Sequence, residues 1–270
     1  MKIGFLTKCA EYAHSTPVMD DVFKRLRQKG VQVQKIVPEE QLIDLSAVRP
    51  TLDLYVLRPG IELGLSLAGI LHDQGANLLN TFPASTLVQD KVRVTQRLLE
   101  NQIPTARSFV VGDLKQAFDA LCNSLIVKPH RGSYGEGIRI FHDREGLPEA
   151  GERGGHFVQE YHSNSGEDLK VYVIGNQVFA LRRKFPAHSY EDKLGTPVEV
   201  DDYLRRIALR IGQLFGLHVY GIDCIDTDCG LLVIDVNFFP GFVGVPNAAK
   251  YLSAYILEYA EQHDAIAAVS

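Results

Sequence analysis

Hydrophobic and polar positions follow two alternating patterns along the N-terminal third of the chain. Short apolar runs bounded by polar residues predict strands at Lys2–Leu6, Val31–Val37, Leu52–Leu57 and Asn77–Leu79. Amphipathic stretches between them predict helices at Val18–Lys29 and Glu62–Gln74, which end at Gly30 and Gly75. This alternation of strands and helices predicts a parallel sheet with helices on its faces.

The pattern changes near Thr81-Phe82-Pro83, where we expect a domain boundary. Ser85 is a candidate cap for a helix that runs to about Glu100 and carries Lys91. The later predicted elements are a strand at Arg107–Val111, a helix capped at Asp113, a strand at Leu125–Lys128, a hairpin of Leu169–Ile174 and Val178–Arg183, and helices near Tyr203–Phe215 and Ala248–Glu261. This part of the chain is therefore richer in hairpins than the N-terminal part.

Length, charge and cysteine usage narrow the class of protein. The 270 residues suffice for roughly one large domain or two to three small ones. A net charge of −5 gives no reason to expect nucleic acid or an anionic membrane as a partner. The apolar run after Met1 is too short for a signal peptide, and no run approaches the roughly 18 apolar residues of a membrane span. Four cysteines without CxxC spacing are expected as buried thiols, which predicts a cytoplasmic protein.

The segment Gly221–Asn237 carries the most informative pattern. If Asp228-Cys229-Gly230 forms a three-residue turn, Asp223 lies directly opposite Asp235, and Gly221 lies opposite Asn237. Period-two alternation then places Asp223, Asp235 and Asn237 on one face. The other face is apolar and holds Ile222, Cys224, Leu232, Ile234 and Val236.

Opposed carboxylates repel each other, and one of them takes up a proton unless a cation lies between them. Two carboxylates and an amide oxygen suit Mg²⁺, so Asp223, Asp235 and Asn237 are candidate metal ligands. The alternative is the solvated polar face of an edge hairpin. The apolar residues around Asp235 favour the metal site over that alternative.

A glycine-rich loop, Gly132-Ser133-Tyr134-Gly135-Glu136-Gly137, follows a strand that ends at Lys128 and precedes another strand-like run. This order differs from Walker and Rossmann loops, which open a helix. Such a loop can lie over a triphosphate and offer backbone N–H groups to its oxygens, while Lys128 adds a positive charge. Taken alone, the loop fits an ordinary flexible hairpin equally well.

The order of these motifs resembles the ATP-grasp superfamily over roughly Pro83 to Tyr255. The matching motifs are Asp90-Lys91, Ile126-Val127-Lys128-Pro129, the glycine-rich loop, Gln159-Glu160-Tyr161, Asp168-Leu169-Lys170-Val171-Tyr172-Val173, Arg182-Arg183, Gly221-Ile222-Asp223 and Asp235-Val236-Asn237. The resemblance implies an α/β (α+β) ATP-grasp fold with an N-terminal, Rossmann-like parallel sheet. It implies an N-terminal domain at 1–82, a subdomain with the glycine loop at 83–160, and a subdomain with the metal site at 161–270.

The resemblance also implies a nucleotide site between two antiparallel sheets. Lys91 and Lys128 would contact the phosphates or the adenine edge. The loop residues over the triphosphate would be Gly132, Ser133, Tyr134, Gly135 and Gly137. Adenine would be hydrogen-bonded, largely through backbone, by Gln159, Glu160 and Tyr161, and Asp168 would bind or orient the ribose. For Lys91 and Asp168, the alternatives are a helix-surface lysine and a turn residue.

The metal and catalytic assignments rest on the same resemblance. Asp223, Asp235 and Asn237 match the magnesium ligands, with Mn²⁺ as an alternative metal. Arg182 matches an arginine that stabilises charge on the transferring phosphoryl group. Arg182 also belongs to a basic cluster in the sequence that suits either a carboxylate substrate or a polyphosphate, and the cluster comprises Lys170, Arg182, Arg183, Lys184, His188 and Lys193. A solvated strand edge is the alternative for the two arginines.

Two subgroups of the superfamily compete. The glycine loop and the Gln159-Glu160-Tyr161 hinge are similar to RimK-type ligases, which join an amino acid, often glutamate, to a carboxylate through an acyl phosphate. Lys170-Val171-Tyr172-Val173 and residues 234–241 are also similar to inositol polyphosphate kinases. RimK-type ligases usually carry Glu where Asp235 stands, and an Arg-Ser-Asn stretch and a Gly-Gly pair that residues 186–195 lack.

We therefore expect an ATP- and Mg²⁺-dependent ligase that acts on a small-molecule or peptide carboxylate and an amino acid. A kinase for a polyol or inositol phosphate is the alternative. A non-catalytic ATP-binding regulator is less favoured because the metal triad and Arg182 are intact. The substrates, and association into a homo-oligomer, are left open by the sequence.

Overall fold

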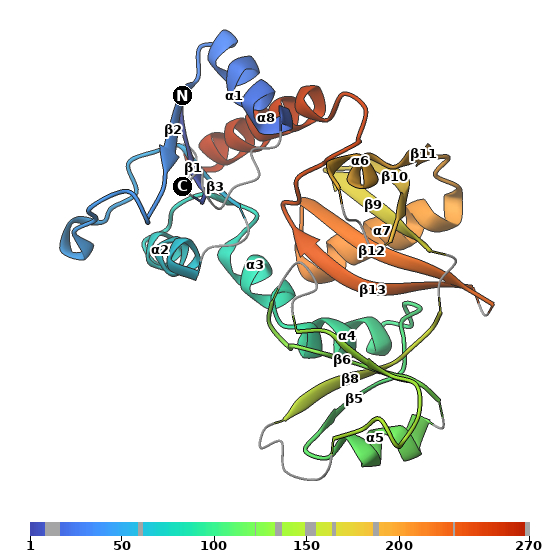
Figure 1. The fold of residues 1–270 in the computed structure, drawn as a ribbon. Helices are drawn as coiled ribbons and strands as arrows, with labels where there is room; N and C mark the ends of the chain where they lie inside the picture. Colours follow the sequence, from blue (N-terminus) through green and yellow to red (C-terminus); the bar gives the residue numbers. More distant parts are fainter. Residues whose placement is uncertain are drawn as a thin grey trace.

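The structure is a computed structural model that describes residues 1–8, 17–58, 62–121, 123–132, 137–148, 155–163, 166–185, 189–228 and 230–267. Its strands form three sheets, one parallel and two antiparallel (Figure 1). Among the described residues, no helix is both long enough and apolar enough to cross a membrane.

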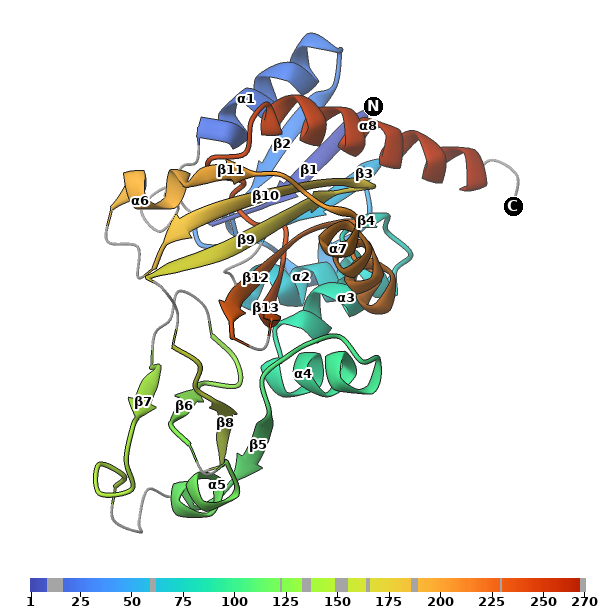
Figure 2. The same cartoon turned by 90° about the vertical axis from the view of Figure 1, so that its right-hand side faces the viewer.

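The first sheet confirms the predicted parallel arrangement. It comprises β1 (Lys2–Leu6), β2 (Gln32–Ile36), β3 (Leu54–Leu57) and β4 (Leu78–Leu79), in the order β2-β1-β3-β4. The helices α1 (Pro17–Gln28) and α2 (Glu62–Asp73) and the short helix η1 (Leu45–Ala47) lie between these strands in the sequence. The C-terminal helix α8 (Ala248–Ala267) returns to lie beside α1 (Figures 1 and 2). Residues 161–270 therefore also contribute to the N-terminal unit.

Two short helices follow the first sheet, where the sequence predicts one. Thr81 caps α3 (Phe82–Val88) by accepting a hydrogen bond from Ala84 N, and Ser85 is buried inside this helix. The predicted role of Ser85 as the cap is therefore wrong. Asp90 begins a second helix, α4 (Lys91–Glu100), because its carboxylate accepts hydrogen bonds from the first backbone N–H groups. Lys91 consequently stands at the start of a helix rather than in its middle.

The second sheet, in the order β5-β8-β6-β7, is antiparallel. It consists of β5 (Ser108–Val111), β6 (Leu125–Lys128), β7 (Arg139–Phe141) and β8 (His156–Glu160), with α5 (Leu114–Leu121) packed against it. A small core between helix and sheet includes Leu114, Leu121, Leu125 and Val158. This core leaves the opposite face of the sheet available to other parts of the chain.

The third sheet, in the order β11-β10-β9-β12-β13, is also antiparallel. It consists of β9 (Glu167–Ile174), β10 (Gln177–Lys184), β11 (Thr196–Val198), β12 (Val219–Thr227) and β13 (Gly230–Phe238). The amphipathic helix α7 (Asp202–Phe215) packs on β9 and β10, and the short helix α6 (Tyr190–Leu194) lies beside β10. The predicted β9–β10 hairpin is confirmed.

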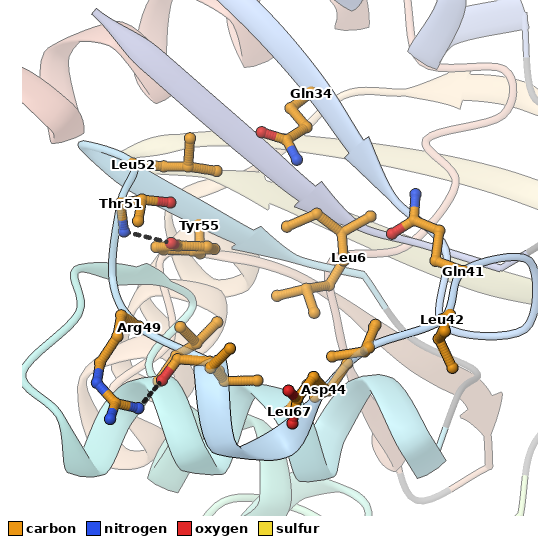
Figure 3. A pocket seen from close by; sticks show the side chains of 15 residues that line it. Leu6, Gln34, Gln41, Leu42, Asp44, Arg49, Thr51, Leu52, Tyr55 and Leu67 are labelled. Carbon is orange, nitrogen blue, oxygen red and sulfur yellow. Dashed lines mark hydrogen bonds between the residues drawn. The ribbon is translucent and has the colours of Figure 1, made fainter.

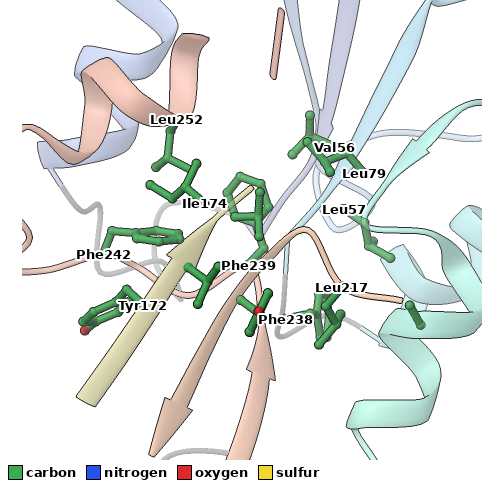
Figure 4. Close-up of a cluster of buried hydrophobic side chains, with 14 of the residues drawn as sticks. Val56, Leu57, Leu79, Tyr172, Ile174, Leu217, Phe238, Phe239, Phe242 and Leu252 are labelled. Carbon is green, nitrogen blue, oxygen red and sulfur yellow. The ribbon is translucent and has the colours of Figure 1, made fainter. Parts of the chain in front are cut away.

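Two features hold the sheets together. Val233 N in β13 donates to Pro104 O over 2.8 Å, and Thr105 Oγ1 donates to Val233 O over 2.7 Å, which ties the third sheet to the segment that enters the second. An apolar cluster around Phe239 and Phe242, both fully buried, joins the end of β13 to the first sheet (Figure 4). The β12–β13 hairpin is therefore fixed at both ends.

A cavity of about 360 Å³ lies beside the first sheet, between β1–β3 and α2 (Figure 3). Its floor includes Leu6 and Leu67, and Tyr55 Oη accepts a hydrogen bond from Thr51 N at one wall. None of its lining residues is among the functional residues that the sequence predicts. The cavity is therefore separate from the candidate site.

Candidate active site

The β12–β13 hairpin brings the predicted metal ligands together. Asp223 stands opposite Asp235, and Gly221 opposite Asn237, which confirms this part of the predicted register. The predicted three-residue turn is wrong, because Thr227 pairs with Gly230 and the register shifts between Asp223 and Cys224. The shift is a β-bulge on the β13 side, where one extra residue interrupts the alternation.

The bulge also changes the apolar face of the hairpin. Val233, rather than Leu232, pairs with Cys224 and is buried. Ile234 lies at the irregularity and is half-buried. The core face of the hairpin therefore holds Ile222, Cys224, Val233 and Val236. The polar positions nearer Asn237 keep the predicted alternation.

One face of the third sheet gathers the charged residues, and we call it the polar face. Lys170 in β9 pairs with Asp223 in β12, and Arg183 in β10 pairs with Asp168 in β9. Residues opposite each other on neighbouring strands share a face, and so do residues two apart along a strand. The polar face therefore comprises Asp168, Lys170, Tyr172, Arg183, Asp223, Asp235 and Asn237.

Arg182, a predicted catalytic residue, lies on the face of the sheet opposite to the candidate metal ligands. It precedes Arg183 by one residue, so its side chain leaves the sheet in the other direction. Its Nη2 donates to Asp226 Oδ2 over 2.7 Å, and the side chains of Arg182 and Asp226 are 35% and 52% exposed. Arg183, not Arg182, is the arginine that stands beside the candidate metal ligands.

Arg183 is held by a two-bond ion pair with Asp168. Arg183 Nε donates to Asp168 Oδ1 over 3.2 Å, and Nη2 donates to Oδ2 over 3.0 Å. Asp168 is buried, and burial raises its carboxyl pKa although Arg183 opposes the shift. Arg183 Nη2 also lies 3.9 Å from Asp223 Oδ1. This geometry favours a role for Asp168 in holding Arg183 over the predicted ribose contact.

Side chains of the protein contact the oxygens of the two opposed carboxylates. Lys170 Nζ forms an ion pair with Asp223 Oδ1, and Asn237 Nδ2 donates to Asp223 Oδ2 over 2.9 Å. Lys91 Nζ lies 3.7 Å from Asp235 Oδ2. Burial raises the pKa of Asp235 against the pull of Lys91. Burial lowers the pKa of the Lys170 amine, but Asp223 and Tyr172 outweigh it, so the net direction is upward.

These residues fit a divalent cation, although the described residues contain no cluster of three or more His, Cys, Asp or Glu. The predicted set consists instead of two carboxylates and an amide on one face. A rotation of the Asn237 amide would present its oxygen in place of Nδ2. All three ligands are then oxygen donors, as Mg²⁺ prefers.

Lys91 links the hairpin to the base of the glycine loop. Its Nζ donates to Gly132 O over 2.8 Å, and its backbone N donates to His130 O over 2.9 Å. Gly132 and Gly137 have φ values of 141° and 73°, in the region that favours glycine. Ser133, Tyr134 and Gly135, which the sequence predicts over the triphosphate, lie outside the described residues, as does Glu136 of the same loop.

Lys128 is buried at the end of β6 in the second sheet. Its Nζ donates to Gln159 Oε1 over 2.6 Å, and Gln159 Nε2 donates to Ser108 Oγ over 3.0 Å. Burial lowers the pKa of the Lys128 amine, while the negative charge of Asp235 acts in the opposite direction. Lys128 therefore lies within electrostatic reach of the candidate metal ligands, and Gln159 positions its amine.

The predicted adenine hinge has its backbone donors engaged within the protein. Glu160 N donates to Arg107 O over 2.8 Å, and Tyr161 N donates to Ser124 O over 2.9 Å. Gln159 uses its side chain to hold Lys128. A base at this position would therefore bond to carbonyl groups of the hinge or to residues that follow Tyr161.

Two features of the site are absent from the sequence predictions. The Asp168–Arg183 pair follows from the predicted Gly175-Asn176 turn by counting outward along both strands, so a sequence signal existed for it. The position of Tyr172 on the polar face follows from the same count, two residues beyond Lys170. The sequence motif contains both residues but gives them no such relation.

Comparisons with known proteins show which family this chain is similar to. Residues 88–257 match the family model of the RimK-like ATP-grasp domain. A protein of Vibrio cholerae serotype O1 named "probable alpha-L-glutamate ligase" is 25% identical over 295 residues, covering 98% of this chain and 97% of that protein. One of the same name from Rhodopirellula baltica is 25% identical over 292 residues, covering 96% of this chain and 70% of that protein.

Solved structures share the fold at low sequence identity. The RimK domain ATP-grasp protein of Sphaerobacter thermophilus has a TM-score of 0.74 at 15% identity, covering 95% of this chain and 100% of that chain. The D-alanine–D-alanine ligase of Bacillus anthracis, solved with ATP, has a TM-score of 0.73 at 17% identity, covering 97% of this chain and 98% of that one. The predicted ATP-grasp fold is thereby confirmed.

Proposed function

Since this chain belongs to the RimK-like ATP-grasp family, we propose that it is an ADP-forming ligase that joins a substrate carboxylate to the amine of an amino acid. The observation that carries the proposal is the convergence of four cations on the candidate metal hairpin. Lys91, Lys170 and Arg183 lie beside its carboxylates, and Lys128 acts on Asp235 from the second sheet. Such a cluster suits a triphosphate and a second anion.

Each residue of the cluster receives a role in this proposal. Asp223, Asp235 and Asn237 would hold Mg²⁺, or Mn²⁺, which when bound neutralises charge on the phosphates. Lys91 and Lys128 would bind phosphate oxygens, with Lys128 held in place by Gln159. The hinge at Gln159–Tyr161 and the glycine loop would bind the rest of the nucleotide.

The chemistry proceeds in two displacements. A carboxylate oxygen of the first substrate attacks the γ-phosphorus of ATP, the bond to the β-phosphate oxygen breaks, and ADP leaves. Arg183 and Lys170 offset the negative charge on the transferring group. The amine of the amino acid then attacks the acyl carbon, phosphate leaves with the bonding electrons, and the nitrogen loses a proton. Position and electrostatics suffice, so no protein nucleophile is required.

Glutamate is the amino acid that we propose first. The relatives in Vibrio cholerae and Rhodopirellula baltica carry the name of alpha-L-glutamate ligases. The basic residues Lys170 and Arg183 suit a substrate with more than one carboxylate. We also propose the ranges 1–82, 83–160 and 161–270 as the N-terminal domain and the two subdomains around the nucleotide.

The test measures ADP and free phosphate together. The protein is incubated with ATP, Mg²⁺, L-glutamate and pools of small carboxylates or peptides. ADP and free phosphate formed in equal amounts, only when carboxylate and amine are both present, is the expected result. ADP formed without free phosphate, with a phosphorylated alcohol as product, would indicate a kinase and contradict the proposal. No ADP formation with intact ATP binding would indicate a regulator.

A further inference from the structure

Tyr172 is a polar-face residue that the proposed reaction does not use. The residue as a whole is only 2% exposed, but its hydroxyl oxygen is not sealed from solvent, and within the described part of the chain this hydroxyl has no hydrogen bond to another protein group. A hydroxyl that reaches the surface at the end of a buried ring, with no partner in the protein, is available to bond a ligand.

The ring of Tyr172 is held firmly in the middle of the third sheet. Its strand, β9, lies between β10 and β12, where Tyr172 pairs with Phe179 and Gly221. The ring packs against Phe242, with 5.3 Å between the ring centroids. Figure 4 shows the hydroxyl oxygen at the end of the ring that points away from Ile174 and Phe239. The hydroxyl is therefore aimed out of the apolar cluster by a rigid support.

The surroundings of the hydroxyl select the charge of a ligand. Lys170 lies two residues earlier on the same face, and Arg183 lies on the adjoining strand. The positive charges of both residues act on Tyr172 more strongly than the negative charges of Asp223 and Asp168 do. Burial raises the pKa of the Tyr172 hydroxyl, so this group stays protonated and can donate a hydrogen bond. An ammonium group would be repelled here, whereas a carboxylate would meet one neutral donor and two cations.

We propose that the Tyr172 hydroxyl donates a hydrogen bond to a carboxylate oxygen of a substrate, beside Lys170 and Arg183. This inference rests on the proposed ligase function and adds a residue to it. The carboxylate is either the one that attacks ATP or one carried by the incoming amino acid, since both have the same chemistry. The bound carboxylate supplies the acceptor that the hydroxyl lacks in the free protein.

The test compares Tyr172→Phe with Tyr220→Phe. The first change removes only the hydroxyl and keeps the ring against Phe242. The second removes a buried hydroxyl that donates to Ala208 O over 2.7 Å, on the α7 side of the same sheet. The KM values for ATP, L-glutamate and the carboxylate substrate are measured for wild type and both variants, together with melting temperatures.

We expect Tyr172→Phe to raise the KM for a carboxylate-bearing substrate about tenfold, as loss of one hydrogen bond to a charged group does. The KM for ATP and the melting temperature should both stay at the wild-type values. A rise in the KM of L-glutamate alone assigns the contact to the amino acid, and a rise for the other substrate alone assigns it to the attacking carboxylate. Tyr220→Phe should leave all three KM values unchanged.

Three outcomes overturn the inference. If Tyr172→Phe has wild-type KM values for both carboxylates, the hydroxyl makes no substrate contact. If it weakens ATP binding to the same degree, or lowers the melting temperature as Tyr220→Phe does, Tyr172 has a structural role. If the wild-type protein itself forms no ADP with any carboxylate and amine, the proposed function fails first and the inference fails with it.

Discussion

Asp168 and Arg183 stand opposite each other on β9 and β10 and are joined by two hydrogen bonds, 3.2 Å from Nε to Oδ1 and 3.0 Å from Nη2 to Oδ2. The pair orients the planar guanidinium so that Nη2 also lies 3.9 Å from Asp223 Oδ1. A carboxylate that grips an arginine in this way fixes both its position and its rotation. The consequence is that Asp168 acts on the site through Arg183.

Asp168→Asn should therefore impair catalysis more than nucleotide binding. We expect kcat to fall about tenfold or more because Arg183 loses its fixed orientation, while the KM for ATP stays near wild type. Loss of one partner of a buried ion pair costs about 3–5 kcal/mol, and we expect the lower end because Asn keeps an acceptor. Steady-state kinetics and a thermal melt check both effects. A raised KM for ATP with unchanged kcat would instead support a ribose contact.

The two neighbouring arginines provide a matched pair of variants. Arg183→Ala removes the cation beside Asp223 and should lower kcat about 100- to 1000-fold, as loss of one stabilising donor does in comparable sites. Arg182→Ala removes an exposed ion pair with Asp226, which is worth only about 0–1 kcal/mol, and should change kcat less than about threefold. Phosphate release by both variants is the measurement. Equal losses would show that the separation of faces has no catalytic meaning.

The sequence predicts most of the site because the alternation of apolar residues fixes the register near Asp223 and Asp235. It fails at the turn, since the β-bulge leaves no mark in residue type. The sequence also gives no reason to separate Arg182 from Arg183. A one-residue step in a strand reverses the face, and residue type does not distinguish two consecutive arginines. The pairing of Arg183 with Asp168 distinguishes them.

The split between α3 and α4 shows a second limit of the sequence. Asp90 ends one hydrogen-bonding pattern and begins the next, although its neighbours suit a continuous helix. The contact of Lys91 with Gly132 is also invisible in the sequence, because it joins two segments that only the folded chain brings together. Long-range contacts of this kind depend on packing between the sheets rather than on local pattern.

The metal assignment is tested by Asp235→Asn with Asp226→Asn as its control. Both changes remove one carboxylate charge from the same hairpin, but Asp226 lies on the opposite face and pairs with Arg182. We expect Asp235→Asn to lose at least about 100-fold in Mg²⁺-dependent turnover, and Asp226→Asn to stay within about twofold. A titration of activity with Mg²⁺ after treatment with EDTA gives the comparison. Retained activity in Asp235→Asn would remove this residue from the metal site.

Lys128 should give the stability of the protein a particular pH dependence. Burial lowers its pKa below the ordinary value of 10.5, so the folded state binds this proton less readily than the unfolded state does. Its destabilising effect is present at low pH and disappears as pH rises through 10.5. Lys128→Met removes the effect, although Gln159 Oε1 then lacks its donor at every pH.

The difference in melting temperature between Lys128→Met and wild type should therefore change in one direction. The melting temperature of the variant, relative to that of wild type, should be highest near pH 7 and should fall as the pH approaches about 10. Thermal melts at three or more pH values over this range provide the measurement. A constant difference would mean that burial does not perturb the amine, and a shift in the variant's favour would mean that its pKa is raised.

Gly244 controls the position of α6 beside the candidate site. Its φ is +82°, and a Cβ atom would overlap the carbonyl oxygen of Leu194 at the end of α6. Gly195 follows Leu194 at the end of α6. It lies so close to Arg183 that a Cβ atom on it would stand 2.6 Å from Arg183 Cγ. A displacement of α6 would therefore reach the arginine that pairs with Asp168.

Gly30 supplies the control, because its φ is +81° and no atom lies within 4 Å of a Cβ built on it. Gly30→Ala should lower the free energy of unfolding only by the cost of holding alanine at a positive φ, about 1–2 kcal/mol, and should leave kcat unchanged. Gly244→Ala has the same cost of a positive φ and also pushes α6 away. We therefore expect a larger drop in melting temperature and a lower kcat. Thermal melts and steady-state kinetics on both variants test this. If the two variants melt together and turn over equally, the contact between Gly244 and α6 does not position Arg183.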